Sequence, residues 1–231
     1  MIVVLSACGG GSGPVNDPGD GGGGDDGGGD DGSGGGGGPP SSPFTAPSEQ
    51  QALYYVNDLP TELDAVQAAY NQGSFTPFAN LPQSTSVAYD GFMEVLFTST
   101  PNANITSNAT FAVNMLTGDT QGSATNFMGM VYNSETDATE LALYEGGVSF
   151  VGGTLSEGAL NEANIAIQID GAFDNGLQAL TVEGEIEGKI FGATADGLYA
   201  SGSYFGLGQD ITLIVDGVPV YGSATLWALK D

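Results

Sequence analysis

The sequence has almost no positive charge. Among 231 residues, Lys and Arg number 2 and Asp and Glu number 28, so the formal net charge is −26. A protein that neutralises phosphates needs clustered Lys or Arg, so nucleic acid is excluded as a partner. The same shortage disfavours electrostatic docking on an anionic membrane surface. The acidity favours solubility and suits a salty setting, in which the repulsion between carboxylates is screened.

Histidine is absent and cysteine occurs once. The chain therefore lacks the side chain most used for acid–base catalysis near neutral pH, which is also the commonest transition-metal ligand. Zinc sites of thiols and imidazoles, Ser–His and Cys–His pairs and redox C-x-x-C motifs are excluded by composition. We therefore expect a protein that is not an enzyme and that has no cofactor and no metal site.

The single cysteine ends a lipobox-like tetrapeptide, Leu-Ser-Ala-Cys, after the apolar run MIVVL. Small residues before the cysteine suit a signal peptidase, and its thiol accepts diacylglycerol. Each buried lipid methylene contributes about 0.8 kcal/mol, and stable anchoring takes more than one chain. A secretory signal has a basic start and an apolar stretch of about 7–15 residues, so we expect Met1 to lie inside a longer signal peptide. Residues 1–8 thus predict a lipidated Cys8. Gly9, where aspartate would favour inner-membrane retention, points to the outer membrane of a Gram-negative bacterium.

Residues 9–46 are predicted to be a disordered tether. They are dominated by glycine and aspartate and hold almost nothing apolar to bury, so ordering them would cost entropy without return. A flexible chain of about 35 residues has a root-mean-square reach of roughly 30–35 Å. Calcium binding stays open as an alternative, because four carboxylates offer hard oxygen ligands: Asp25, Asp26, Asp30 and Asp31. Their period near five and the lack of an apolar position favour a charge-extended linker.

Residues 47–83 contain two helical patterns. The first starts at Ser48, a good N-cap, and the second starts at Pro60 and ends at Gly73. The apolar positions with helical spacing are Leu53, Val56 and Leu59 in the first, and Leu63, Val66, Ala69 and Tyr70 in the second. We expect one or two short helices that pack on an end of the folded domain.

From residue 84 to 231 the pattern changes to short, β-rich runs separated by turn residues. In the run NIAIQID the three isoleucines share one face, and in EGEIEGKI charged residues alternate with Gly and Ile. Inward glycines suit tightly curved sheets. These runs predict a mainly β fold, an antiparallel up-and-down β-barrel of about eight strands, with a sandwich as the alternative. We expect a filled interior, a polar outer face and a monomer.

One stretch resembles a known family. Residues 180–205, LTVEGEIEGKIFGATADGLYASGSYF, are similar to the signature of the transferrin-binding protein B-like β-barrel domains. The matching positions are Leu180, Gly184, Gly188, Phe191, Gly192, Ala195 and Gly202, and upstream Phe111, Gly118 and Gly122. The usual FYGP is replaced by IFGA. The resemblance implies an outer-membrane, often surface-exposed lipoprotein with an eight-stranded barrel that binds a protein or a small ligand, and it assigns no site.

We therefore expect a surface binding module for an unknown protein or small-molecule ligand, with a structural or assembly lipoprotein facing the periplasm as the alternative. Two loops are candidate contact surfaces, through Thr98, Asn102, Asn104, Asn133, Glu135 and Asp137. A contact patch of aromatic residues would use Tyr54, Tyr55, Tyr199, Tyr204 and Trp227. A third hypothesis, a carboxylate-based hydrolase using Glu183 and Glu185, is weak because both carboxylates fall on the face assigned to solvent.

Overall fold

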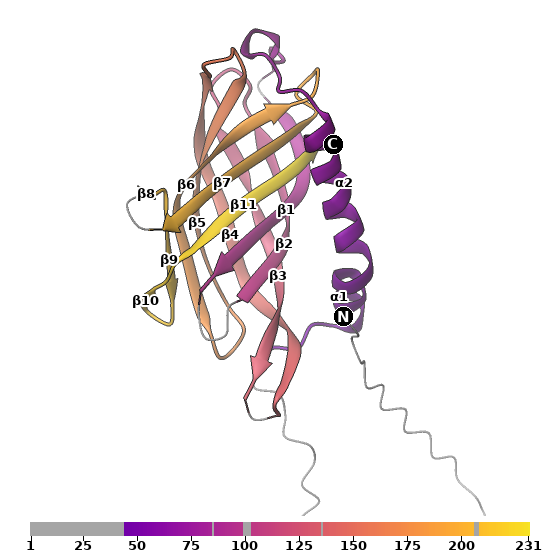
Figure 1. Ribbon diagram of the computed structural model, residues 1–231, viewed down its shortest axis with the longest axis vertical. Coiled ribbons are helices and arrows are strands. Elements are labelled where there is room, and N and C mark those ends of the chain that lie inside the picture. Colours follow the sequence, from indigo (N-terminus) through magenta and orange to yellow (C-terminus); the bar gives the residue numbers. More distant parts are fainter. Residues whose placement is uncertain (1–43, 85, 99–102, 135, 206–207) are drawn as a thin grey trace, which may run out of the picture. The chain divides into compact units, whose positions relative to one another are not determined.

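The computed structural model describes residues 44–84, 86–98, 103–134, 136–205 and 208–231 (Figure 1). All of them belong to one compact unit, Gly38–Asp231. The predictions for Cys8, for most of the tether with its aspartates, and for Asn102 and Glu135 lie outside the described residues.

The described strands form one antiparallel sheet. They are β1 (Val87–Phe97), β2 (Ala103–Val113), β3 (Thr120–Asn133), β4 (Ala138–Glu157), β5 (Ala163–Asp174), β6 (Ala179–Phe191), β7 (Gly197–Phe205), β8 (Gly208–Gln209), β9 (Ile211–Val215), β10 (Val218–Pro219) and β11 (Gly222–Lys230).

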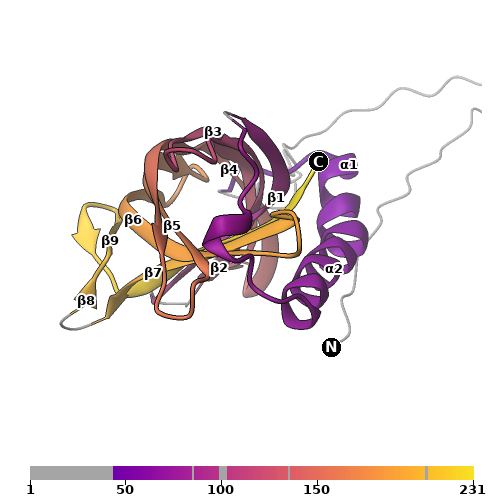
Figure 2. The same cartoon turned by 90° about the horizontal axis from the view of Figure 1, so that it is seen from above.

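Eight of these strands close into a barrel. Strands β1 to β6 pair with their sequence neighbours, the end of β6 pairs with β7, and β11 joins β7 back to β1. The first half of β6 pairs instead with β9, so that β8, β9 and β10 form a side excursion. Figure 2, seen from above, shows the ring of strands. The predicted antiparallel barrel of about eight strands is confirmed, and closure leaves only these short strands as edges.

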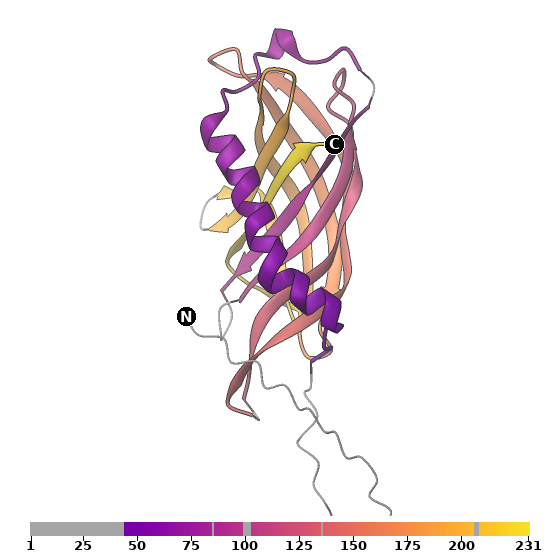
Figure 3. The ribbon, with the colours of Figure 1, turned by 90° about the vertical axis from the view of Figure 1, so that its right-hand side faces the viewer.

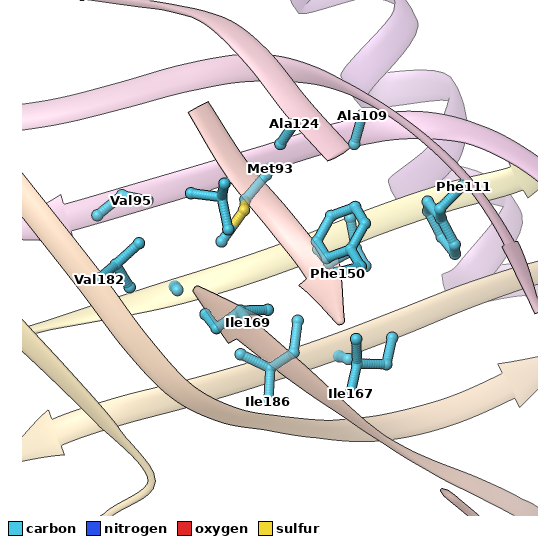
Figure 4. Close-up of a cluster of buried hydrophobic side chains, with 14 of the residues drawn as sticks. Met93, Val95, Ala109, Phe111, Ala124, Phe150, Ile167, Ile169, Val182 and Ile186 are labelled. Carbon is cyan, nitrogen blue, oxygen red and sulfur yellow. The ribbon is translucent and has the colours of Figure 1, made fainter. Parts of the chain in front are cut away.

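Apolar side chains fill the inside of the barrel. Ile165, Ile167 and Ile169 are at most 2% exposed, as their shared face predicted. Figure 4 shows side chains from β1, β2, β4, β5 and β6 meeting there. Phe127 stacks on Phe173 with ring centroids 4.4 Å apart. The alternation in β6 is confirmed too, because its isoleucines are buried and its glutamates lie on the outer wall.

The two helical patterns join into one continuous helix. Helix α1 (Glu49–Leu53) runs through a π-helical turn, η1 (Tyr54–Asp58), into α2 (Leu59–Gln72). Ser48 caps its start with a capping box, in which Ser48 and Gln51 each bond the other's backbone N–H. The wider π-helical turn ends at Asp58, two residues before Pro60, which has no N–H to donate. The proline therefore changes the pitch of the helix and does not end it.

The helix lies along the outer wall of the barrel, so the expectation that it packs on an end was wrong (Figures 2 and 3). Leu59 and Val66 pack on Phe92, an outward-facing residue of β1. Leu53 and Val56 are 52% and 45% exposed, against expectation, and Tyr54 and Tyr55 face the barrel in their place. The wall carries apolar side chains here, and the helix removes them from water.

The two ends of the barrel differ in what covers them. The chain enters at the end where β3 connects to β4 and β5 connects to β6, which we call the entry pole. There the N–H of Thr45 donates to Asn175 O at 2.7 Å. The opposite end, the far pole, carries turns 114–119, 158–162 and 192–196. The extended segment 73–84, which includes a 3-10 turn, η2 (Phe78–Asn80), crosses this pole and pairs through Thr76 with Ile190 and Ala163. Phe78 and Leu81 pack from this segment onto the core.

Candidate functional site

The main candidate site is a groove on the outer wall near the far pole, between the last turn of α2 and strands β4 to β7. It has a volume of about 340 Å³, and we call it the aromatic groove. Its lining residues are Tyr70, Ser156, Asn164, Ile165, Ala166, Glu187, Gly188, Lys189 and Tyr199. Small-molecule pockets range from roughly 300 to 1,000 Å³, so this groove is at the small end.

One wall of the groove is aromatic. Tyr70 reaches from α2 to Tyr199 on β7, with ring centroids 5.0 Å apart. Both rings also pack on Trp227 of β11, at 5.3 Å from Tyr70 and 4.3 Å from Tyr199. Phe191 adds an edge contact to Tyr70 at 5.5 Å. Each ring is therefore fixed by several others before any ligand arrives.

The far-pole side of the groove holds an ion pair. Lys189 Nζ lies 2.9 Å from Glu162 Oε1 and 4.5 Å from the centre of the Phe75 ring. The hydrogen bond from Lys189 is the main reason that the pKa of Glu162 lies below its ordinary value, and the N–H of Leu160 donates to the same carboxylate. Lys189 thereby joins β6 to the turn before β5 and to the segment that crosses the pole.

The floor and the remaining wall of the groove are polar. Asn164 on β5 lies opposite Lys189 in register, and its buried Oδ1 has no hydrogen-bond partner within the described part of the chain. Glu187 is exposed on β6 and pairs in register with Ser201. The hydroxyl of Tyr199 lies 3.2 Å from Ser201 Oγ. Ser156 closes the groove on the side of β4.

The predicted contact residues that the structure describes gather at the entry pole, away from the aromatic groove. Thr98 is exposed and donates its N–H and its hydroxyl to Tyr221 O, at 2.8 and 3.0 Å. Asp137 is exposed and accepts from the hydroxyl of Tyr132 at 2.6 Å. Asn133 corrects the prediction, because it is 2% exposed and its Nδ2 donates to Glu140 at 2.9 Å. Its side chain supports the β3–β4 hairpin and does not offer a contact.

Asn104, also exposed, borders a second, smaller hollow of about 150 Å³ with Glu94, Leu96, Ser223 and Thr225. Burial raises the pKa of Glu94 above its ordinary value, although a hydrogen bond from Asn104 acts in the opposite direction. Burial, and then the charge of Glu94, raise the pKa of Tyr55 on the helix above it. The hollow therefore contains a partly desolvated carboxylate, that of Glu94, and lies beside the start of the helix.

The carboxylates of the weak hydrolase hypothesis lie on the outer wall of β6, on the face assigned to solvent. Glu183 is exposed opposite Asp170, and Glu185 accepts a hydrogen bond from Gln168. In the described ranges, no group of three or more Cys, Asp or Glu side chains is placed to hold a metal ion. No helix in the same residues is long and apolar enough to cross a bilayer.

Sequence reasoning found part of the aromatic groove. Tyr199 and Trp227 were among the proposed aromatic contacts and line or support it, whereas Tyr204 stacks elsewhere, on Tyr221. Tyr70 was assigned only to the buried stripe of its helix, and Asn164 was not singled out. Lys189 could have been singled out from the sequence. It is one of only two cationic side chains among 28 acidic ones, so an ion pair at this position was to be expected.

Comparison with known proteins adds no relative. No family model, no curated protein and no solved structure matches this chain. The function of this chain therefore has to be inferred from its sequence and from the site itself.

Proposed function

We propose that this protein is an outer-membrane lipoprotein, anchored through Cys8, whose barrel is a non-catalytic surface binding module. The resemblance to transferrin-binding protein B-like barrels supports the same class. The lipobox-like tetrapeptide and the Gly/Asp-rich residues after it support an anchor and a tether. The compact unit that follows supports a module that acts at a distance from the lipid.

The observation that carries the proposal is the position of the aromatic groove. The interior of the barrel is filled, so a ligand has to bind on the outside. The chain enters the barrel at the entry pole, and the groove lies beside the far pole. The groove is open on the outer wall, where a partner outside the barrel can reach it. At the entry pole, Asn104 borders the smaller hollow of about 150 Å³, which makes this end the weaker contact surface.

The test is protease shaving of intact cells, with Cys8→Ala as the control. The lipidated protein should incorporate labelled palmitate and lose its barrel to proteinase K added outside. Cys8→Ala should do neither, because it has no thiol to acylate. Protection of the wild-type barrel until the outer membrane is opened would overturn surface exposure and favour the periplasmic assembly role. Equal labelling of both chains would overturn the anchor.

A further inference from the structure

We propose that the aromatic groove binds a neutral saccharide. This inference rests on the proposed binding module and names its ligand class. A sugar ring has two kinds of surface, a face of C–H bonds and a rim of hydroxyl groups. The aromatic groove presents a matching pair of surfaces on its two walls.

The aromatic wall matches the C–H face. Tyr70 and Tyr199 line the groove with rings that combine an apolar body and a polar tip. Trp227 packs against both rings and Phe191 packs against Tyr70, and these contacts hold the rings in place. A ligand that stacks on them does not have to freeze mobile side chains, which lowers the entropic cost of binding.

The polar wall matches the hydroxyl rim. Each hydroxyl group donates one hydrogen bond and accepts others, so it needs both kinds of partner. The groove offers acceptors on Asn164 and Glu187, a donor on Lys189, and both on Ser156. Leaving a buried acceptor without a partner destabilises a protein, and Asn164 Oδ1 has none in the described part of the chain. A rotation of the Asn164 amide that turns Oδ1 towards the groove would let a ligand hydroxyl supply the missing donor.

The charges in and beside the groove argue against ionic ligands. Lys189 is already paired with Glu162, so an anion finds no free cation there, and Glu187 repels it. The net charge of −26 adds to that repulsion. Glu187 and the net charge would attract a cationic ligand, but that ligand would meet the ammonium of Lys189, which already occupies the face of Phe75. The ligand that suits all of these groups is polar, hydroxylated and uncharged.

The test is a titration of the full chain carrying Cys8→Ala, which has no lipid, with lactose, cellobiose, maltose and N,N′-diacetylchitobiose. Amide NMR shifts and Trp227 fluorescence report binding. At least one of these sugars should bind saturably and shift the amides of Asn164, Glu187 and Tyr199. Glucuronic acid and choline, the anionic and cationic probes, should bind at least tenfold more weakly.

Two variants test the two walls. Tyr199→Leu and Asn164→Ala should each weaken binding at least tenfold, whereas Tyr204→Leu, an aromatic change outside the groove, should not. Thermal unfolding of each variant shows that it is folded. No saturable shift with any of the four sugars, tighter binding of an ionic probe, or unchanged binding by both groove variants would overturn the proposal. The outcome of protease shaving does not depend on these titrations. The proposed lipid anchor and the proposed saccharide ligand can therefore be refuted independently of each other.

Discussion

At the scale of single residues, Glu94 shows how burial sets the sign of a pH effect. Burial raises its pKa in the folded chain above the ordinary value. Between the two values the folded chain binds more protons than the unfolded chain, so stability falls as pH rises. Above the raised pKa, Glu94 is charged in the folded chain, and its desolvation lowers the stability by the full amount. Glu162 has the opposite sign, because its lowered pKa contributes stability that is lost as pH falls.

We predict that Glu94→Gln stabilises the protein at neutral pH. Glutamine keeps an oxygen that accepts from Asn104, and it removes the partly buried charge. The gain should shrink as pH falls towards the ordinary pKa of glutamate, because the wild-type carboxyl is then neutral as well. Urea unfolding at several pH values measures both effects. Glu187→Gln removes an exposed charge and serves as the control. An equal gain from the control, or a gain for Glu94→Gln that does not depend on pH, would contradict the burial argument.

Local geometry explains two of the glycines in residues 180–205, Gly188 and Gly192. A methyl group at Gly188 would overlap the carbonyl oxygen of Tyr199, so β6 and β7 approach closely only because the residue is glycine. Gly192 has φ +88, in the region that favours glycine, and it begins the turn between the same strands. The spacing of these residues in the sequence therefore reflects the geometry of one hairpin.

At the scale of elements, the helix depends on its packing for its place. In its last turn, Tyr70 makes ring contacts with Phe75, Phe191, Tyr199 and Trp227. Helices in proteins gain most of their stability from such packing. At the other end of the helix, the hydroxyl of Tyr54 donates to Glu62 at 2.7 Å and lies 3.1 Å from Asn108 of β2.

We predict that Tyr70→Ala releases the last turns of α2 before the barrel unfolds. Phe→Ala and Trp→Ala changes in cores cost about 3–5 kcal/mol, and Tyr70 is half-buried, so we expect about 2–3 kcal/mol. Native-state hydrogen exchange should show faster exchange in residues 63–72 than in β4 and β5. Tyr132→Ala, an exposed tyrosine of the β3–β4 hairpin, should cost about 1 kcal/mol or less. Uniform loss of protection throughout the barrel would show that helix and barrel unfold together.

The elements also show what could be predicted from the sequence. Side chains along a strand alternate between its two faces. The isoleucines of β5 and the Gly/Ile pattern of β6 therefore predicted correctly which face of each strand is buried. The continuous helix was missed because Pro60 is a common break, and the π turn that absorbs it leaves no clear mark in the sequence. The aromatic groove was missed in part for a different reason. It joins Tyr70 to Asn164 and Tyr199, and their meeting depends on where the helix docks, which periodicity does not specify.

At the scale of the whole molecule, the dominant feature is the excess of negative charge. The 28 acidic residues include six in residues 1–43, so most of the charge belongs to the folded unit. The pairing of β5 with β6 places Asp170 directly opposite Glu183 on the outer wall, which is an unfavourable like-charge pair. The ion pair of Lys189 with Glu162 relieves little of this, since partly exposed pairs contribute about 0–1 kcal/mol. Compact charge repels itself, and the barrel tolerates this because its apolar core is continuous.

We predict that added NaCl stabilises the full chain. Salt shortens the screening length from about 30 Å at 0.01 M to about 3 Å at 1 M, which weakens repulsion in the folded state more than in the expanded unfolded state. The midpoint of thermal unfolding should rise with salt at pH 7, by about 2–4 °C for each 1 kcal/mol gained. The same titration near the ordinary pKa of the carboxylates should show a smaller rise, because fewer of them are charged. A salt response of equal size at both pH values would point to an effect of salt on apolar burial, and the self-repulsion argument would then fail.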